Sequence, residues 1–270
     1  MKCANKNEKK CKISIISIFF CNFADSNNKN NMSKKLIPLI FTILALFHTP
    51  YAHAQTETYE CEDTCQHIHG IDISHYQGNI FWETIGENTK MAYVYIKATE
   101  GGDRIDSKYE QNLLTAHQYG LKVGSYHFYR PITPQETQLQ NFYTQCRPSE
   151  QDIIPMIDVE STSGLPTEQF CDSLFKFLEL VEETYRQRPL IYTGANFYDK
   201  HLAGKLDRYL IMIAQYTKRE PKLKDERDIT MWQYTGKGSL NGIKGYVDKS
   251  RFMGDHKLRE IRFKHRKGED

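Results

Sequence analysis

Residues 155–160 read PMIDVE, and this stretch holds the strongest clue to the fold. An apolar run that begins at Ile153 ends there in two carboxylates, Asp158 and Glu160. Because burying an unpaired charge costs free energy, a strand in an ordinary core is not expected to end in this way. The stretch therefore predicts either a strand that ends at solvent or a pair of carboxylates with a chemical role.

Apolar runs of the same kind recur along the chain. They are rich in β-branched and aromatic residues, and several lack the polar alternation of a half-exposed strand, which is typical of strands covered on both faces. Eight runs are predicted as strands, at residues 69–74, 91–100, 122–130, 152–160, 189–194, 209–216, 229–235 and 245–252.

Helical segments separate only the earlier strands. Residues 107–120 begin with a capping-box pattern from Ser107 to Glu110, residues 133–146 begin with a Thr-Pro cap signal, and residues 166–187 carry an apolar stripe at helical spacing. No strong helix is predicted after the sixth strand. The sequence therefore predicts an α/β fold, a parallel barrel that helices cover in its first part and that is irregular in its last part.

Acidic residues lie at the ends of these strands. Asp158 and Glu160 are two residues apart, so their side chains point to one face, with Cα atoms about 6.6 Å apart. Asp72, Glu100 and Asp248 belong to three other predicted strands. Catalytic groups of such barrels lie at the carboxyl ends of the strands, and repulsion within a cluster of acids keeps some of them protonated. A proton donor beside an ionised carboxylate is what the cleavage of a glycosidic bond requires.

Aromatic residues are frequent at the same strand ends. Their rings suit the faces of sugars, although tyrosine and tryptophan also pack ordinary cores. The residues are Tyr126, Tyr129, Tyr192, Tyr216, Trp232 and Tyr234. Together with the acids, they predict a carbohydrate-cleaving site at the mouth of the barrel.

The first 54 residues have the layout of a targeting segment. From Met32, two lysines precede an apolar run of about a dozen residues, too short to span a bilayer, and the run leads to Ala52-His53-Ala54, a small-x-small cleavage pattern. We expect residues 32–54 to be a signal peptide and translation to start at Met32, with residues 1–31 as an upstream extension outside the protein. The alternative is an uncleaved amino-terminal anchor that uses the stretch ISIISIFF.

The rest of the chain is predicted as one domain with two short flanks. Residues 55–68 form a polar lead-in, residues 69–254 the catalytic barrel, and residues 255–270 a solvated basic tail, with attraction to an anionic polymer as the alternative for the tail. We expect an exported monomer, periplasmic or secreted, without a membrane span after cleavage of the signal.

The net positive charge of the full chain comes from its first 54 residues, called the leader below. The chain has 36 lysines and arginines and 34 acidic residues, of which the first 54 residues hold eight lysines and two acids. Residues 55–270 are left with 28 basic and 32 acidic side chains, a net charge of −4. Because a nucleic-acid-binding protein would show a basic face, no nucleic-acid partner is expected.

Four cysteines follow the leader: Cys61, Cys65, Cys146 and Cys171. An even number in an exported protein favours disulfides. Of the three possible pairings we prefer Cys61–Cys65 with Cys146–Cys171, and the wide spacing of the second pair argues against a zinc site.

Six motifs, in this order within residues 69–253, resemble glycoside hydrolase family 25, the Chalaropsis-type lysozymes or N-acetylmuramidases. They are HGIDISHYQGNIFW, YVYIKATEG, VGSYHFYRP, PMIDVE, PLIYTG and MWQYTGKGSLNGIKGYVDKSRF. The resemblance implies a flattened, TIM-like barrel of five β/α units followed by three strands. It also implies cleavage, without a cofactor or metal, of the β-1,4 bond between N-acetylmuramic acid and N-acetylglucosamine in peptidoglycan glycan strands.

The resemblance also implies roles for particular residues. Glu160 matches the general acid, and Asp158 matches a partner that holds the substrate's acetamido group or stabilises positive charge in the transition state. Asp72 and Asp248 match the other two acids of the site. Residues expected to line the sugar groove are Tyr126, His127, Tyr192, Gln233 and Tyr234, and Glu100 is expected either to contact substrate or to pair with Lys97. One departure is Ile211-Met212-Ile213, where the family often has a tryptophan, which puts one sugar or packing contact in doubt.

Two other functions stay open at this point. One is a non-catalytic module that binds peptidoglycan or another glycan through the same groove. The other is a metal-dependent polysaccharide deacetylase, in which His69, His75 or His127 would join aspartates around zinc.

Overall fold

A computed structural model describes residues 67–265. The expectations for residues 1–31, for the signal peptide at 32–54, for Cys61 and Cys65 and for most of the lead-in lie outside the described residues.

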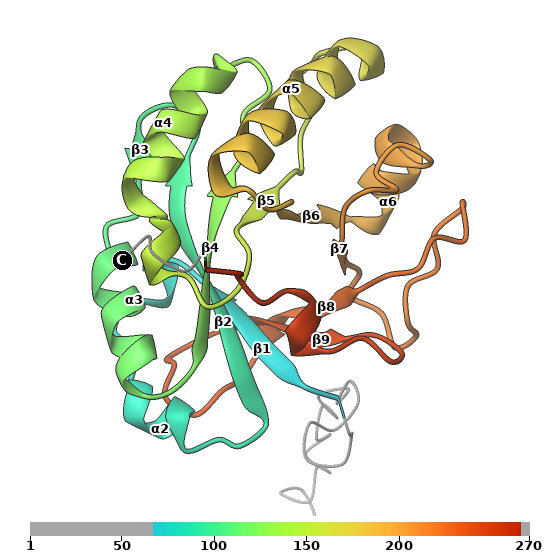
Figure 1. The fold of residues 1–270 in the computed structure, drawn as a ribbon. Coiled ribbons are helices and arrows are strands. Elements are labelled where there is room, and N and C mark those ends of the chain that lie inside the picture. The colour runs from blue at the N-terminus through green and yellow to red at the C-terminus, as the bar shows by residue number, and fades with distance from the viewer. Residues whose placement is uncertain (1–66, 266–270) are drawn as a thin grey trace, which may run out of the picture. The chain divides into compact units, whose positions relative to one another are not determined.

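The described residues form a closed barrel of eight strands (Figure 1). The strands are β1 (His69–Ile73), β2 (Met91–Glu100), β4 (Lys122–Phe128), β5 (Met156–Asp158), β6 (Leu190–Gly194), β7 (Ile211–Ala214), β8 (Met231–Gly238) and β9 (Val247–Phe252). Neighbouring strands are parallel from β1 through β2 to β8, whereas β9 runs antiparallel to both β8 and β1 and closes the barrel. A short additional strand, β3 (Arg104–Ile105), pairs with the end of β2 outside the barrel.

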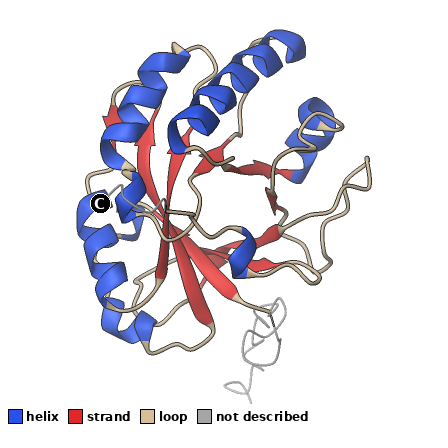
Figure 2. Ribbon diagram, viewed as in Figure 1, coloured by secondary structure: helices blue, strands red, loops and turns tan. Residues whose placement is uncertain are grey.

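Helices follow each of the first five barrel strands. They are α2 (Trp82–Gly86), α3 (Tyr109–Gln118), α4 (Gln135–Gln145), α5 (Thr167–Tyr185) and α6 (Ala195–Phe197), which continues into the π-helical turn η3 (Tyr198–Leu202). Three 3₁₀ turns complete the chain: η1 (His75–Gln77), η2 (Pro148–Glu150) and η4 (Leu258–Glu260). Helices cover the barrel from α2 round to α6, and the side formed by β7, β8 and β9 carries loops and the turn η4 (Figure 2). The prediction of five β/α units followed by three strands is confirmed.

Two helix starts differ from their predictions, because neither α3 nor α4 has a side-chain cap. The side chain of Asp106, rather than that of Ser107, accepts a hydrogen bond from the main-chain N–H of Lys108 (3.0 Å), and α3 begins at Tyr109. This bond closes a turn before the helix, of the kind that aspartate side chains form with the main chain two residues on. α4 begins at Gln135 with Pro134 as its N-cap, so Thr133 does not cap it.

Two apolar layers explain the apolar runs of the sequence. Side chains at alternate strand positions fill the barrel, among them Tyr95, Met156 and Met212. The positions between them, such as Val94 and Ile157, face the helices and the loops outside. Because both faces of the strands are buried, the strands need apolar residues at successive positions.

The C-terminal segment is part of the domain rather than a solvated tail. Ile261 is fully buried in the interior layer, and its carbonyl accepts a hydrogen bond from the main-chain N–H of Ile154 (2.7 Å). Phe263 is 5% exposed and donates its main-chain N–H to the carbonyl of Asp152 (2.9 Å). The segment therefore closes the barrel where β5 begins, and the predicted boundary at residue 254 falls too early.

The predicted disulfide between Cys146 and Cys171 is wrong, since both thiols are free and buried. The carbonyl of Cys146 accepts a hydrogen bond from the hydroxyl of Tyr185 (2.7 Å), the last residue of α5, whereas Cys171 lies near the start of that helix. The 14 residues between Cys171 and Tyr185 correspond to about 21 Å of helix. A disulfide needs Cα atoms within about 7 Å.

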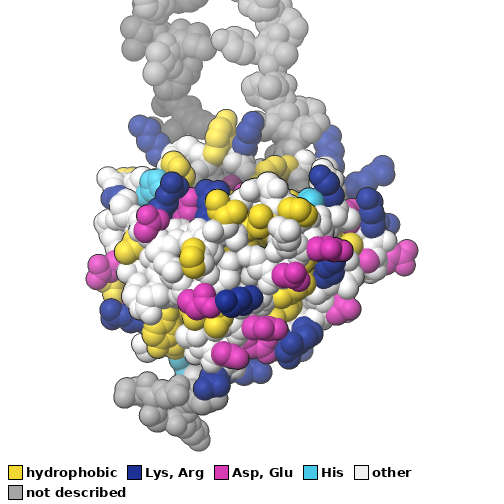
Figure 3. Space-filling model, turned by 90° about the horizontal axis from the view of Figure 1, so that it is seen from above, with side chains coloured by type: hydrophobic (Ala, Val, Ile, Leu, Met, Phe, Trp, Pro, Cys, Tyr) yellow, Lys and Arg dark blue, Asp and Glu magenta, His cyan; other side chains and the backbone are white. Residues whose placement is uncertain are grey.

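Charges of both signs are mixed over the face seen from above Figure 1. In Figure 3, lysine and arginine side chains alternate with aspartate and glutamate on the described part of this face, with apolar side chains between them. No helix among residues 67–265 is long and apolar enough to cross a membrane.

Candidate active site

Four carboxyl groups from three parts of the barrel meet at its mouth. Asp72 of β1 and Asp248 of β9 lie directly opposite each other in the ladder that closes the barrel. Asp158 is the last residue of β5, and Glu160 lies two residues beyond it. The charges of Glu160, Asp72 and Asp248 each act on Asp158, so the four groups form one electrostatic cluster.

Asp72 is held in its acid form by burial. Its side chain is almost completely buried, and the amide of Gln233 donates a hydrogen bond to Oδ2 (3.0 Å) while Oδ1 has no partner among the described residues. Burial, reinforced by the nearby charge of Asp248, raises the pKa of Asp72 to about 8, although the bond from Gln233 opposes the shift. Asp72 is therefore mostly protonated at neutral pH.

The pKa values of the other three acids are raised as well. Burial and the charge of Glu160 raise the pKa of Asp158 well above its usual range. Burial raises the pKa of Glu160, against a hydrogen bond from Tyr192 and the charge of Lys97. Burial and the charge of Glu160 raise the pKa of Asp248 to about 6. A cluster in which some members keep a proton at mildly acidic pH can supply both a proton donor and an ionised partner.

Gln233 connects the acids to two tyrosines. Its Oε1 accepts hydrogen bonds from the hydroxyls of Tyr192 (2.9 Å) and Tyr216 (2.8 Å), and its Nε2 donates to Asp72. Because both ends of the amide are used, its orientation is fixed. A Cβ atom placed on Gly236 would lie 3.1 Å from the hydroxyl of Tyr216 and 3.2 Å from Oδ1 of Asp248, so a side chain there would displace these groups by a few tenths of an ångström.

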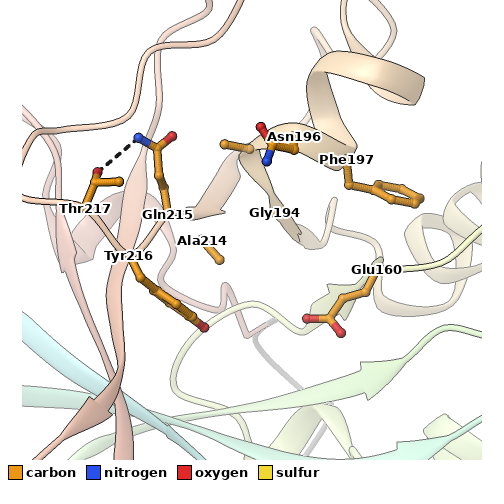
Figure 4. Close-up of a pocket in the computed structure, with 9 residues that line it drawn as sticks. Glu160, Gly194, Asn196, Phe197, Ala214, Gln215, Tyr216 and Thr217 are labelled. Atoms are coloured by element: carbon orange, nitrogen blue, oxygen red, sulfur yellow. Dashed lines mark hydrogen bonds between the residues drawn. The ribbon is translucent and has the colours of Figure 1, made fainter.

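A cavity of about 730 Å³ lies beside Glu160, at the ends of β6 and β7. Figure 4 shows the carboxylate of Glu160 and the ring of Tyr216 pointing into this cavity from opposite sides. Asn196 and Phe197 line it from the start of α6, and Gln215 and Thr217, joined by a 3.1 Å hydrogen bond, line it from the loop after β7. The lining residues are Glu160, Gly194, Ala195, Asn196, Phe197, Ala214, Gln215, Tyr216 and Thr217.

Most of these lining residues were not among the predicted site residues. Only position could have identified Asn196, Phe197 and Gln215 from the sequence. Each lies within three residues of the end of a barrel strand, where barrels place their sites. Polar and aromatic residues at such positions also occur in ordinary loops, so their types add little.

Two predicted groove residues lie elsewhere. His127 is fully buried on the helix side, where its ring bonds to Thr99 Oγ1 (2.8 Å) and Gln138 Oε1 (3.2 Å). Tyr234 is 4% exposed, bonds to Nδ1 of His69 (3.1 Å) and belongs to the outer layer. Successive side chains of a strand point to opposite faces, so the neighbours of the inward-facing Tyr126 and Gln233 had to point outward.

Tyr126 and Tyr192 do face the acids. Both rings pack in the interior layer, and the charge of Asp158 adds to burial in raising the pKa of each hydroxyl. They remain neutral hydrogen-bonding groups at the floor of the mouth.

Glu100 pairs with cations, which is the second of the two roles expected for it. Its Oε2 lies 2.8 Å from Lys97 Nζ, and its Oε1 lies 2.8 Å from Arg104 Nη1 and 2.6 Å from Arg130 Nη2. Burial would raise the pKa of Glu100, but the hydrogen bonds from Lys97 and Arg130 outweigh it and lower the pKa to about 2. Glu100 is therefore ionised at neutral and at mildly acidic pH.

The histidines near the mouth serve other purposes. His75 follows β1 and bonds through Nδ1 to the buried carboxylate of Asp106 (2.6 Å). Among residues 67–265, no group of three or more histidine, cysteine, aspartate or glutamate side chains has the arrangement of a metal site.

A closed α/β barrel with acids clustered at one mouth is an architecture that glycoside hydrolases use. The family model "Glycosyl hydrolases family 25" matches residues 71–243, so the chain belongs to that family.

Related proteins agree with this assignment. The chain is 31% identical over 191 residues to the uncharacterized protein YegX of Escherichia coli K12, covering 69% of this chain and 70% of YegX. It is 32% identical over 183 residues to an autolytic lysozyme of Clostridium acetobutylicum, covering 68% of this chain and 55% of that protein. The structure of a family 25 glycosyl hydrolase from Bacillus anthracis matches with a TM-score of 0.66 and 31% identity, over 73% of this chain and 94% of that one.

Proposed function

We propose that this protein hydrolyses the β-1,4 bond between N-acetylmuramic acid and N-acetylglucosamine in peptidoglycan, by carboxylate acid/base catalysis. The observation that carries the proposal is the convergence of Asp72, Asp158, Glu160 and Asp248 at one open mouth, with pKa values raised by burial. The similarity to an autolytic lysozyme supports the choice of substrate.

In this mechanism Glu160 is the general acid. It is the only one of the four that lines the open cavity, where it can reach a leaving oxygen, and its raised pKa keeps a transferable proton. Asp158, directly beneath it, holds the substrate's acetamido group or stabilises the positive charge of the transition state. Asp72 keeps its own proton, and together with the amide of Gln233 it fixes the hydrogen-bond directions at the floor.

We further propose that the protein acts outside the cytoplasm, either in the periplasm or after secretion, as a monomer. The expected signal peptide and the location of peptidoglycan support this placement. Fractionation of cells that produce the full chain, with detection of the mature amino terminus, tests it.

The decisive experiment follows the lysis of purified peptidoglycan with and without EDTA, with mass spectrometry of the products. We expect a fall in turbidity and new reducing ends at muramic acid, both unaffected by EDTA. Binding without lysis would indicate a glycan-binding module instead. Release of acetate that EDTA abolishes would indicate a metal-dependent deacetylase.

A further inference from the structure

A group of three cations, Lys97, Arg104 and Arg130, borders the acid cluster at the ends of β2 and β4. We call these three residues the cationic wall. All three pair with a single carboxylate, Glu100. Asp103, in the turn between β2 and β3, is exposed, and the charge of Lys97 also acts on Asp158 and Glu160 of the acid cluster.

A register shift in β2 turns the wall toward the mouth. The pairing of β2 with β4 shifts between Lys97 and Thr99, so Lys97 and Glu100, three residues apart, can bond on the same side of the sheet. Lys97 follows the interior residue Tyr95 by two positions and therefore faces the inside of the barrel. Its charge opposes the burial that raises the pKa of Glu160, which places the two groups within electrostatic reach.

Two buried amides of α4 hold the main chain of the wall in place. Gln138 accepts a hydrogen bond from the N–H of Arg130 (2.9 Å) and donates one to its carbonyl (3.0 Å). Asn141 donates to the carbonyls of Gly101 (2.9 Å) and Arg104 (3.2 Å), which fixes the turn and β3. The backbone is thus set before any ligand arrives, which lowers the entropic cost of binding.

The guanidinium groups themselves remain accessible. The side chains of Arg104 and Arg130 are 71% and 40% exposed. Arg104 donates to Glu100 through Nη1, and Arg130 through Nε and Nη2. A guanidinium has more N–H donors than these contacts use, and its planar fork matches a carboxylate. Both guanidinium groups therefore have N–H donors left for a further acceptor.

We propose that the cationic wall binds a carboxylate of the peptide that peptidoglycan carries on its muramic acid residues. This inference rests on the proposed function and narrows its substrate to glycan strands with anionic peptide substituents. The peptide would leave the groove on the β2–β4 side, across the mouth from the cavity lined by Phe197 and Tyr216.

The test varies the charge on both partners. Peptidoglycan is compared with the same material after its carboxyl groups have been converted to neutral amides. We expect kcat/KM of the unaltered protein to be about tenfold lower on the amidated peptidoglycan, mainly because KM rises when charge-assisted hydrogen bonds are lost. The double variant Arg104→Gln/Arg130→Gln should cleave the unmodified and the amidated peptidoglycan at the same low rate.

Two further variants separate an effect of the cationic wall from a general effect of losing a surface arginine. Arg104→Gln alone changes an exposed side chain and should lose part of the preference without any effect on folding. Arg208→Gln is the matched control, because Arg208 is 61% exposed and also pairs with a glutamate, Glu182, away from the mouth. It should behave like the unaltered protein.

Three outcomes would overturn the inference. The unaltered protein could cleave both forms of peptidoglycan equally, or amidation could lower the activity of the double variant as much as that of the unaltered protein. Either result would show that the cationic wall does not bind a carboxylate of the substrate. Amidase-treated strands lose the peptide but keep the lactyl carboxylate, and full activity on them would assign the contact to the lactyl group. If no peptidoglycan preparation gave new reducing ends, that result would instead contradict the proposed function itself.

Discussion

At the scale of single residues, the environment of the four acids has two opposing effects, one that favours the protonated form and one that favours the ionised form. Burial raises their pKa values, which keeps a proton available, while the hydrogen bond from Gln233 to Asp72 and the charge of Lys97 near Glu160 favour the ionised forms. The cluster therefore holds fewer charges than carboxyl groups at mildly acidic pH.

Replacing the proposed general acid should abolish lysis without unfolding the protein. Glu160→Gln keeps the shape of the side chain but has no transferable proton, so kcat should fall by about 10²–10⁴-fold. Affinity for the wall, measured by co-sedimentation, should change little. Glu183→Gln alters an exposed glutamate of α5 and serves as the control. Substantial lysis by Glu160→Gln would move the acid role to another residue.

The pH dependence of activity should reflect the same cluster. We expect kcat/KM to fall on both sides of a mildly acidic optimum, because the donor must be protonated and its partner ionised. Free carboxyl groups have pKa values of about 4. Because the pKa of Glu160 is raised and that of Asp248 is about 6, the optimum should lie at a higher pH than these values would give. A flat profile between about pH 4 and pH 8 would contradict the raised pKa values.

At the scale of strands and loops, the sequence allowed the prediction of what each strand end carries but not of every side chain's direction. PMIDVE correctly marked a strand end with inward acids. His127 and Tyr234 were misplaced because each neighbours an inward residue, and the alternation that excludes them was not applied. The Cys146–Cys171 pairing failed because two cysteines on packed helices can lie at opposite ends of them, which spacing in the sequence does not reveal.

The close approach at β8 gives a prediction for Gly236. Gly236→Ala would push apart the hydroxyl of Tyr216 and the carboxylate of Asp248 by a few tenths of an ångström. Because catalytic geometry tolerates little displacement, kcat/KM should fall about tenfold. Circular dichroism should show an unchanged fold, and full activity would mean that the two groups need no fixed separation.

The C-terminal segment gives a prediction about stability. Ile261→Ala removes a fully buried side chain from the interior layer and should lower the free energy of unfolding by about 2–5 kcal/mol. Arg259→Ala, an exposed change two residues earlier, should stay within about 0.5 kcal/mol. Urea titration measures both. Equal effects would mean that the segment does not anchor the barrel.

At the scale of the whole molecule, the raised carboxyl pKa values predict greater stability in acid than in base. The folded protein holds protons on Asp72 up to about pH 8, whereas the unfolded chain releases them near pH 4, so stability falls as pH rises between these values. His127, whose pKa burial lowers to about 4, acts in the opposite sense below pH 6.5. Glu100, with a pKa of about 2, loses its contribution only below about pH 4.5.

Several acids have raised pKa values, whereas two histidines, His127 and His201, have lowered ones. The melting temperature should therefore be higher at about pH 5 than at about pH 8. Asp72→Asn should be more stable than the unaltered protein at pH 8 and equal to it near pH 4. Calorimetry at both pH values tests this. A melting temperature that rises steadily toward pH 8 would show that the acids are ionised without cost.

The pairing of β1 with β9 has a consequence for synthesis. The strand that carries Asp72 is among the first to leave the ribosome, and the strand that brings Asp248 beside it is the last. Until that final strand arrives, the sheet has an open edge and the charge partner of Asp72 is missing. The proposed activity would therefore begin only once β9 has paired with β1 and has brought Asp248 beside Asp72.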